Sequence, residues 1–594
     1  MDRDRSAEPS TAPLFLRPGT METLACAVAA LVYSGTLGFG FVYDDVLQIF
    51  KSPALREWRY LPQYFTSHVL AALYPGAGGN YYRPLLLLWL RLNFVLFGPQ
   101  PAGWHAATVL CHVLATYLVF RVAEQVADDR MIAFSAATLF AVHPVHIESV
   151  AWISGVSDPL MSCFFLGSLS AFFDWRKSAK LGPAVYSLIL FGFALLSKET
   201  AVVLPALIFV AMVVDGRATA AVETGTRRVW LSMRESARYV LVAIVYLAVR
   251  FRALHGFSHP AISLSWTQVF LTWPAVLWFY ARHLLLPIGL SEFYSLNYLD
   301  HATGRGFWLP LAMLTLLLLA SWLWIRTLPQ RSAQGSAVWF ATALVILPML
   351  PVLDLRSLTV GDIVHDRYLY LPSAGFALLV ALSIAALAQR LPERRRILVP
   401  TALIGVLSLL FAVLTVTEQR QWVNDIFLYT RGAESAPDNL TVRDNLANAL
   451  LAANQPNRAI PLYLEVLMRD PNFWRSNYNL GFAYYETGNP AAAEPFFQRA
   501  IMIDSSDPDE YIYLALVDLQ LKKFSDADQR ARQAITRNPH ARGYYFVLGL
   551  TCKSQGDLRA AIEAFNTELA LHPDNTAAAA ELQKLEGTAT RPHP

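Results

Sequence analysis

The chain has 594 residues, of which 55% are hydrophobic and only 16% charged, and its formal net charge is +3. Soluble domains carry about 25% charged residues, so this composition excludes an ordinary soluble protein and indicates a membrane protein. The small net charge gives no reason to expect a nucleic-acid partner, and the four scattered cysteines show no metal-binding spacing and suggest no disulfide framework.

Apolar segments recur from residue 21 to about residue 416, and most approach the ~20 residues that cross a bilayer as a helix. The first has no small-residue cleavage site before Asp44 and is interpreted as an uncleaved signal anchor, with a cleaved signal peptide as the alternative. A further apolar segment, 266–286, contains Pro274 and is expected to lie in the interface or to re-enter. The eleven predicted spans are 21–42, 104–123, 131–145, 158–174, 183–197, 200–214, 237–250, 306–325, 337–353, 372–389 and 397–416.

Lysine and arginine are concentrated in four loops, and this bias predicts the orientation of the spans. The residues are Arg176, Lys177 and Lys180; Arg217, Arg227, Arg228, Arg234 and Arg238; Arg326 and Arg331; and Arg390, Arg394, Arg395 and Arg396. If these loops are cytoplasmic, residues 1–20 form a cytoplasmic tail and loop 43–103 lies outside. The transmembrane domain 21–416 then ends on the outer side, together with everything after it.

From residue 440 the sequence repeats every 34 residues, with small residues at the expected helix crossings. This is the tetratricopeptide signature, and it predicts four repeats over 440–575 that stack into an α-solenoid with a protein- or peptide-binding surface. A degenerate half-repeat is predicted over 417–439, and a capping helix with a tail over 576–594. The corresponding positions are Leu446, Ala459, Tyr463 and Pro471; Leu480, Ala493 and Phe497; Leu514, Ala527, Ala531 and Pro539; and Leu548, Ala561, Phe565 and Pro573.

The predicted fold class is therefore all-α, a polytopic membrane helix bundle of about 11 spans followed by a C-terminal tetratricopeptide solenoid. Under the predicted topology, five polar clusters from distant segments face the outer side of the membrane. Ionisable residues that gather in this way indicate a functional site. They are Asp44 and Asp45 in FVYDD; Arg83 in YYRPL; His143, His146, Glu148 and Asp158 in HPVHIESVAWISGVSDPL; Lys198 and Glu199 in LLSKET; and Arg367 in HDRYLYLPSAGF.

Each cluster also has a simpler interpretation. The two aspartates could only end a signal anchor, Lys198 could lie in a solvated turn, and Arg367 could be an interfacial anchor. A metal site built from the histidines of the HPVHIE segment is disfavoured, because Pro144 breaks the helical geometry that such a pair would use.

These residue types suit the transfer of a sugar from a lipid phosphate. Cations such as Arg83, Lys198 and Arg367 could hold the phosphate, where arginine offers bidentate bonds. A carboxylate at the outer end of a membrane helix could take the proton from an acceptor hydroxyl. The neighbouring acid would orient this carboxylate or bind the acceptor. The chemistry needs the lipid-linked sugar as donor and no further cofactor; a divalent metal stays open as an alternative without support in the sequence.

The ordered set FVYDD, YYRPL, HPVHIESVAWISG, SKE and RYLYLPS, followed by tetratricopeptides, resembles the transmembrane and tetratricopeptide-repeat O-mannosyltransferases and their bacterial relatives. These belong to the C-type glycosyltransferase (GT-C) superfamily, and the resemblance spans about residues 21–586. It implies a polyprenyl-phosphate donor and an inverting transfer of a hexose, foremost mannose, outside the cytoplasm. The implied acceptor is a hydroxyl, often that of a protein serine or threonine.

The resemblance also implies roles for individual residues. Asp44 and Asp45 match the acidic pair of the family, with Asp44 as the base. Without assigned individual roles, Arg83, His143, His146, Glu148, Lys198, Glu199 and Arg367 match motif positions. The chain departs from the family at 154–158, where many relatives carry a basic-plus-acidic run and only the acid, Asp158, remains.

Two other functions fit parts of the sequence. A non-enzymatic membrane anchor could present the tetratricopeptide array as a scaffold, but it has little need of eleven spans with polar residues on one side. A transporter of lipid-linked glycans would place ionisable residues near mid-membrane, whereas these are expected near one face. The predicted location is a bacterial inner membrane with the repeats in the periplasm; the alternative is the endoplasmic reticulum membrane with luminal repeats.

Overall fold

The computed structural model describes residues 19–74, 79–215, 225–256, 264–302, 304–326, 333–358 and 362–589. These residues form helices and connecting segments without a β-strand, which confirms the all-α prediction. Most of the tail predicted over 1–20 and the last residues of the C-terminal tail lie outside the described ranges. The chain divides into two compact units, residues 1–435 and 436–594.

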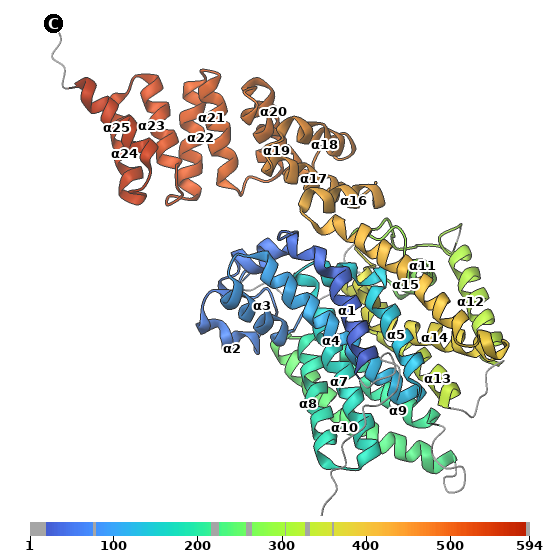
Figure 1. Cartoon of the computed structure of the whole chain (residues 1–594). Coiled ribbons are helices and arrows are strands. Elements are labelled where there is room, and N and C mark those ends of the chain that lie inside the picture. Colours follow the sequence, from blue (N-terminus) through green and yellow to red (C-terminus); the bar gives the residue numbers. More distant parts are fainter. Residues whose placement is uncertain are drawn as a thin grey trace, which may run out of the picture. The chain divides into compact units, whose positions relative to one another are not determined.

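The first unit is a bundle of long helices (Figure 1), and each of the eleven predicted spans overlaps a helical segment in it. Its α-helices are α1 (Thr20–Tyr33), α2 (Leu61–Tyr64), α3 (Pro84–Phe97), α4 (Pro101–Ala127), α5 (Arg130–Val142), α6 (Ile147–Ala151), α7 (Ser157–Ser178), α8 (Leu181–Ser197), α9 (Leu204–Val214), α10 (Gly225–Leu254), α11 (Trp266–Leu285), α12 (Trp308–Arg326), α13 (Ala333–Ile346), α14 (Tyr370–Ala388), α15 (Leu398–Glu418) and α16 (Asp425–Ser435).

Among the described residues, seven helices are long and apolar enough to cross a membrane, and an eighth is obtained if a bent pair counts as one span. The pair is Arg130–Val142 with Pro144–Ala151, which meet at 53° where Pro144 interrupts the helix. The three other predicted spans fall on the short helices Leu181–Ser197 and Glu199–Val214 and on α10, whose first half carries several arginines. The chain is a multi-pass membrane protein, and within its described residues eight of the eleven predicted spans fall on helices that meet this length and hydropathy criterion when the bent pair counts as one.

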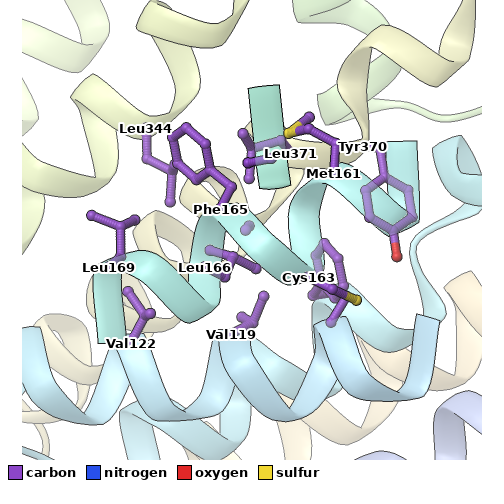
Figure 2. Packing of buried hydrophobic residues seen from close by; sticks show 14 of the residues in the cluster. Val119, Val122, Met161, Cys163, Phe165, Leu166, Leu169, Leu344, Tyr370 and Leu371 are labelled. Carbon is purple, nitrogen blue, oxygen red and sulfur yellow. The ribbon is translucent and has the colours of Figure 1, made fainter. Parts of the chain in front are cut away.

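The centre of the first unit is a close-packed layer between α4, α7, α13 and α14. Figure 2 shows Phe165, Leu166 and Leu169 of α7 among Val119 and Val122 of α4, with Leu344 of α13 beside them. All six side chains are buried. Because lipid is as apolar as these side chains, the packing stabilises the bundle mainly through van der Waals contact. It also holds the first turn of α7, where Asp158 lies.

Short irregular segments join the long helices at the positions where the sequence carries its polar clusters. They include the helical turns η3 (Val46–Lys51), η6 (Pro144–His146), η7 (Ser154–Val156), η8 (Glu199–Val203) and η12 (Asp366–Leu369). Non-helical backbone at membrane depth is stable only where protein or water satisfies its polar groups. These breaks are therefore natural places for a functional site.

Helix α11 corresponds to the segment 266–286 and is not among the helices that qualify as spans. Ser265 and Gln268 form a capping box at its start, and Pro274 lies inside it. Its buried face, including Val276 and Phe279, packs with residues 363 and 364 ahead of η12. This packing brings the segment after α11, which contains Glu292, toward the start of α14.

The second unit contains four helix pairs and a final helix, as the 34-residue period predicts (Figure 1). Ala459, Ala493, Ala527 and Ala561 are fully buried, one in each pair. A Cβ on Gly549 would lie 2.5 Å from the ring of Phe565, so only glycine allows this approach. The helices are α17 (Leu440–Ala452), α18 (Pro456–Arg469), α19 (Trp474–Glu486), α20 (Pro490–Ile503), α21 (Pro508–Gln520), α22 (Phe524–Arg537), α23 (Tyr544–Gln555), α24 (Leu558–Leu571) and α25 (Thr576–Ala589). Helix α16, within the predicted half-repeat, belongs to the first unit.

Candidate active site

The FVYDD segment forms a tight turn that gives its two aspartates different surroundings. Tyr43 has a left-handed backbone, with φ 56°, and its N–H donates to Asp425 Oδ1 at 2.8 Å. Bulky residues adopt this conformation only where neighbouring contacts enforce it. Asp45 then turns into the protein and is fully buried, whereas Asp44 remains partly exposed.

Asp45 ties the first outer loop to the hairpin that precedes α7. Its Oδ1 accepts hydrogen bonds from the N–H of Ser154 at 2.9 Å and from the Ser154 hydroxyl at 2.6 Å. Its Oδ2 accepts from the N–H of Val42 at 3.1 Å. Burial raises the pKa of Asp45 to about 7, although these donors oppose the shift. A carboxylate occupied in this way positions its neighbours and has no free access to a substrate.

Replacement of Asp45 by Asn is expected to make folding stability less dependent on pH. The folded-state pKa lies above the unfolded value, so the stability contributed by protonated Asp45 is complete below about pH 4. It is lost as the pH rises through about 7. Unfolding of the detergent-solubilised protein between pH 4.5 and 8 measures this slope, with the exposed Asp128→Asn as control. An unchanged slope in Asp45→Asn contradicts the assignment.

Asp44 is the acid of the pair that keeps access to its surroundings. The amide of Gln48 donates to Asp44 Oδ2 at 3.4 Å, one helical turn further along the chain. Burial raises the pKa of Asp44, and the positive charge of Arg367 acts in the opposite direction. A carboxylate with a raised pKa is a stronger base when ionised, which suits proton abstraction from a hydroxyl.

The three predicted phosphate-binding cations all form ion pairs. Arg83 contacts Glu199 through Nε at 3.0 Å and Nη2 at 2.6 Å. The Nζ atom of Lys198 lies 2.6 Å from both carboxylate oxygens of Asp158. The side chains of Arg83 and Arg367 remain 14% and 18% exposed, whereas that of Lys198 is 2% exposed. The two arginines are therefore better placed than Lys198 to meet a ligand.

Asp158, at the end of segment 154–158, has its partner cation in a distant segment. The cation for Asp158 comes from the junction of α8 and α9 and not from the adjacent sequence. Both side chains are buried, so each neutralises a charge that would otherwise be costly.

His143 and His146 lie in the packed interior, apart from the Glu148 carboxylate. The Nε2 atom of His146 is 2.6 Å from the Ser373 hydroxyl, and Nε2 of His143 is 3.2 Å from the Leu284 carbonyl oxygen. Their rings pack at tilted angles against aromatic side chains, His146 against Phe140 and His143 against Phe411. Within the described residues, the possible metal-ligating group containing Glu148 includes neither histidine.

The sequence analysis missed Glu292, which lies in the segment between α11 and α12. Arg367 Nη1 contacts its Oε1 at 3.0 Å and also pairs with Glu148. Burial, and next the charge of Glu148, raise the pKa of Glu292 well above its usual range. The signal in the sequence was weak: one acid within the aromatic segment GLSEFYSL, with no helical periodicity.

A cavity of about 280 Å³ lies beside the Arg83–Glu199 pair. Tyr368 in its wall lies 5.0 Å, ring centre to Nζ, from Lys198. The mixture of apolar and polar walls suits an amphipathic ligand. The lining residues are Asn80, Tyr81, Glu199, Thr200, Val202, Tyr246, Leu247, Arg250, Pro351, Val352, Asp354, Leu358 and Tyr368.

The fold and the charged cluster define a class: polytopic α-helical membrane proteins with ion-paired residues at their helix breaks and a tetratricopeptide solenoid. Residues 82–249 match the profile of the family described as dolichyl-phosphate-mannose-protein mannosyltransferase. Residues 445–509 and 514–576 match that of the tetratricopeptide repeat. Together with the relatives described next, these matches show that the chain is similar to the TMTC-like protein O-mannosyl-transferases.

The relatives are similar along most of this chain. The protein O-mannosyl-transferase TMTC3 of Mus musculus is 25% identical, over 93% of this chain and 64% of its own length. The protein O-mannosyl-transferase F38B6.6 of Caenorhabditis elegans is 26% identical, over 75% of this chain and 62% of its own. The chain thus spans less than two thirds of these relatives. Among solved structures, the crystal structure of MamA is similar over 25% of this chain and 86% of its own, with 24% identity and a TM-score of 0.24.

Proposed function

We propose that this protein is a membrane glycosyltransferase that moves a hexose, foremost mannose, from a polyprenyl-phosphate donor to a hydroxyl of an acceptor protein. One observation carries the proposal. Asp44 is a partly exposed carboxylate at a place where distant segments of the chain meet, and the positive charge of Arg367 acts on it. The match to a mannosyltransferase profile over 82–249 and the names of the relatives support it.

In the proposed reaction, Asp44 takes the proton from a serine or threonine hydroxyl of the acceptor. The hydroxyl oxygen forms a bond to the anomeric carbon as the bond from that carbon to the phosphate oxygen breaks. The electron pair leaves with the lipid phosphate, which is a stable anion and needs no proton. Attack opposite the leaving group inverts the anomeric configuration.

The arginines of the site would bind the donor. Arg83 and Arg367 retain exposed surface beside the cavity that contains Glu199 and Tyr368, and guanidinium groups bind phosphate oxygens in pairs. The apolar walls of that cavity, such as Leu247 and Val352, would accept the first part of the polyprenyl chain. The buried Lys198–Asp158 pair and Asp45 then act as positioning residues.

The tetratricopeptide unit would recruit the acceptor or a partner protein. Helix-pair arrays of this kind present an extended concave surface that binds peptides. We place the reaction and the repeats on the extracytoplasmic side, in the periplasm of a bacterium, with the lumen of the endoplasmic reticulum as the alternative setting. The concentration of lysine and arginine in four loops supports this orientation.

The test is transfer by the purified full chain in proteoliposomes that contain radiolabelled polyprenyl-phosphate mannose and envelope proteins as acceptors. Label in protein that is released by β-elimination supports O-linked transfer. Acceptor binding without any label in protein contradicts the proposal and indicates a scaffold. Movement of the donor lipid across the bilayer without product also contradicts it, in favour of a transporter. Labelled polyprenyl-phosphate glucose in a parallel reaction tests the choice of sugar.

A further inference from the structure

Three buried side chains from separate segments converge beside Arg367. Glu148 belongs to α6, Glu292 to the segment after α11, and His365 immediately precedes η12. One ligand atom from each lies within 4.8 Å of the other two. The three residues are only 3%, 1% and 2% exposed, so water has little access to their polar atoms.

Two atoms in this group lack the hydrogen bonds that buried polar atoms normally make. Within the described residues, Glu292 Oε2 and His365 Nδ1 have no hydrogen-bond partner. The Nδ1 atom lies 3.6 Å from Glu292 Oε1, so the imidazole faces the carboxylate. Because an unsatisfied buried polar atom is costly, the arrangement points to a bound species between these side chains.

The charges around the group also leave a surplus of negative charge. Arg367 contacts both Glu148 and Glu292, so one positive charge faces two carboxylates in the described structure. Asp362 adds a further carboxylate, 3.3 Å from Nε2 of His365. In a buried site a surplus of negative charge is neutralised by a cation or by a proton.

The position of Asp362 favours a cation. A metal-bound histidine usually directs its second ring nitrogen toward a carboxylate, which keeps the proton on that nitrogen. Nε2 of His365 lies 3.3 Å from Asp362 Oδ1 and Nδ1 faces Glu292, so a proton on Nε2 would leave the lone pair of Nδ1 to a cation beside Glu292. Two ligand atoms on a tetrahedral ion with bonds of about 2.1 Å lie roughly 3.4 Å apart, close to the observed 3.6 Å separation.

We propose that Glu148, Glu292 and His365 bind one first-row divalent cation, Mn²⁺ or Zn²⁺. A nitrogen ligand among carboxylates suits these ions, whereas Mg²⁺ and Ca²⁺ prefer oxygen alone. Three protein ligands leave a coordination position for water or an anion. This inference does not depend on the proposed transferase function, since metal binding is measured without a substrate.

The experiment uses the full chain in detergent, stripped with chelator and dialysed separately against Mn²⁺, Zn²⁺ and Mg²⁺. We expect one equivalent of Mn²⁺ or Zn²⁺ per chain and a thermal midpoint that rises with the bound ion. Glu292→Gln and His365→Gln are expected to weaken binding at least about tenfold, as loss of a metal ligand or its support does. The exposed residues of the second unit provide matched controls, Glu563→Gln and His540→Gln, which should bind like the parent.

A spectroscopic measurement separates metal coordination from a general loss of structure. With Mn²⁺ bound, pulsed electron paramagnetic resonance should show ¹⁴N coupling from one imidazole, and His365→Gln should lose it while Glu292→Gln retains it at saturating metal. Absence of stoichiometric Mn²⁺ and Zn²⁺ from the parent protein, or unchanged binding and coupling in His365→Gln, overturns the proposal. Glu148 and Glu292 would then share a proton instead.

Discussion

Replacement of Asp44 by Asn is expected to lower the transfer rate by about 100- to 10,000-fold, the usual contribution of a general base. The amide has nearly the shape of the carboxylate but cannot accept the proton of the acceptor hydroxyl. Asp44 is partly exposed and accepts a single long hydrogen bond from Gln48, so the protein should fold as before. Initial rates in proteoliposomes and the thermal midpoint in detergent measure the two effects.

Asp128→Asn is the matched control for this change. Asp128 ends α4 with a left-handed backbone that asparagine adopts easily, and it lies away from the ion-paired cluster.

In the parent protein the rate of transfer should rise with pH through a pKa above the ordinary aspartate value, because burial raises the pKa of Asp44 and only the ionised form is a base. A folded Asp44→Asn protein with full transfer activity excludes Asp44 as the base.

Replacement of Lys198 by Met is expected to destabilise the membrane unit by about 3–5 kcal/mol, because it leaves the buried Asp158 carboxylate without its partner. The double variant Lys198→Met with Asp158→Leu should recover most of this loss, since an apolar pair fills the space without a buried charge. Chemical unfolding in mixed micelles measures the free energies of unfolding.

The exposed pair of Arg59 and Glu57 provides the control, and Arg59→Met should cost no more than about 1 kcal/mol. Activity of the double variant distinguishes two roles of Lys198. A stable double variant that retains transfer assigns the pair to positioning, as its burial indicates. A stable but inactive double variant instead assigns Lys198 to donor binding, which is the role expected from the sequence.

Most of the fold could be predicted because its signals are local. Long apolar runs predicted helices at all eleven expected spans, and the 34-residue period predicted the four helix pairs of the second unit. Boundaries were less predictable: Pro144 divides one expected span into a bent pair, and α16 belongs to the first unit and not with the repeats. The bend follows locally from Pro144, whereas the place of α16 depends on packing partners that lie far away in the chain.

The candidate site could be predicted as a set of residue types but not as a set of contacts. The polar clusters of the first unit do converge, and Asp44, Arg83 and Arg367 retain access to a ligand. Sequence spacing could not show that Asp45 bonds to Ser154 or that His146 faces Ser373. Glu292 escaped notice because one acid in an aromatic segment has no periodic or motif signal.

The sequence by itself determined the helices, the repeats and the list of chemically active side chains, because periodicity, hydropathy and residue chemistry are properties of short segments. Only the tertiary structure decided which charge neutralises which: Lys198 pairs with Asp158, Arg83 with Glu199, and Arg367 with both Glu148 and Glu292. The physical reason is that the strength of an ion pair depends on separation and burial, and both are set by packing between distant helices. The same packing separated the adjacent acids of FVYDD into a buried aspartate at position 45 and an accessible one at position 44.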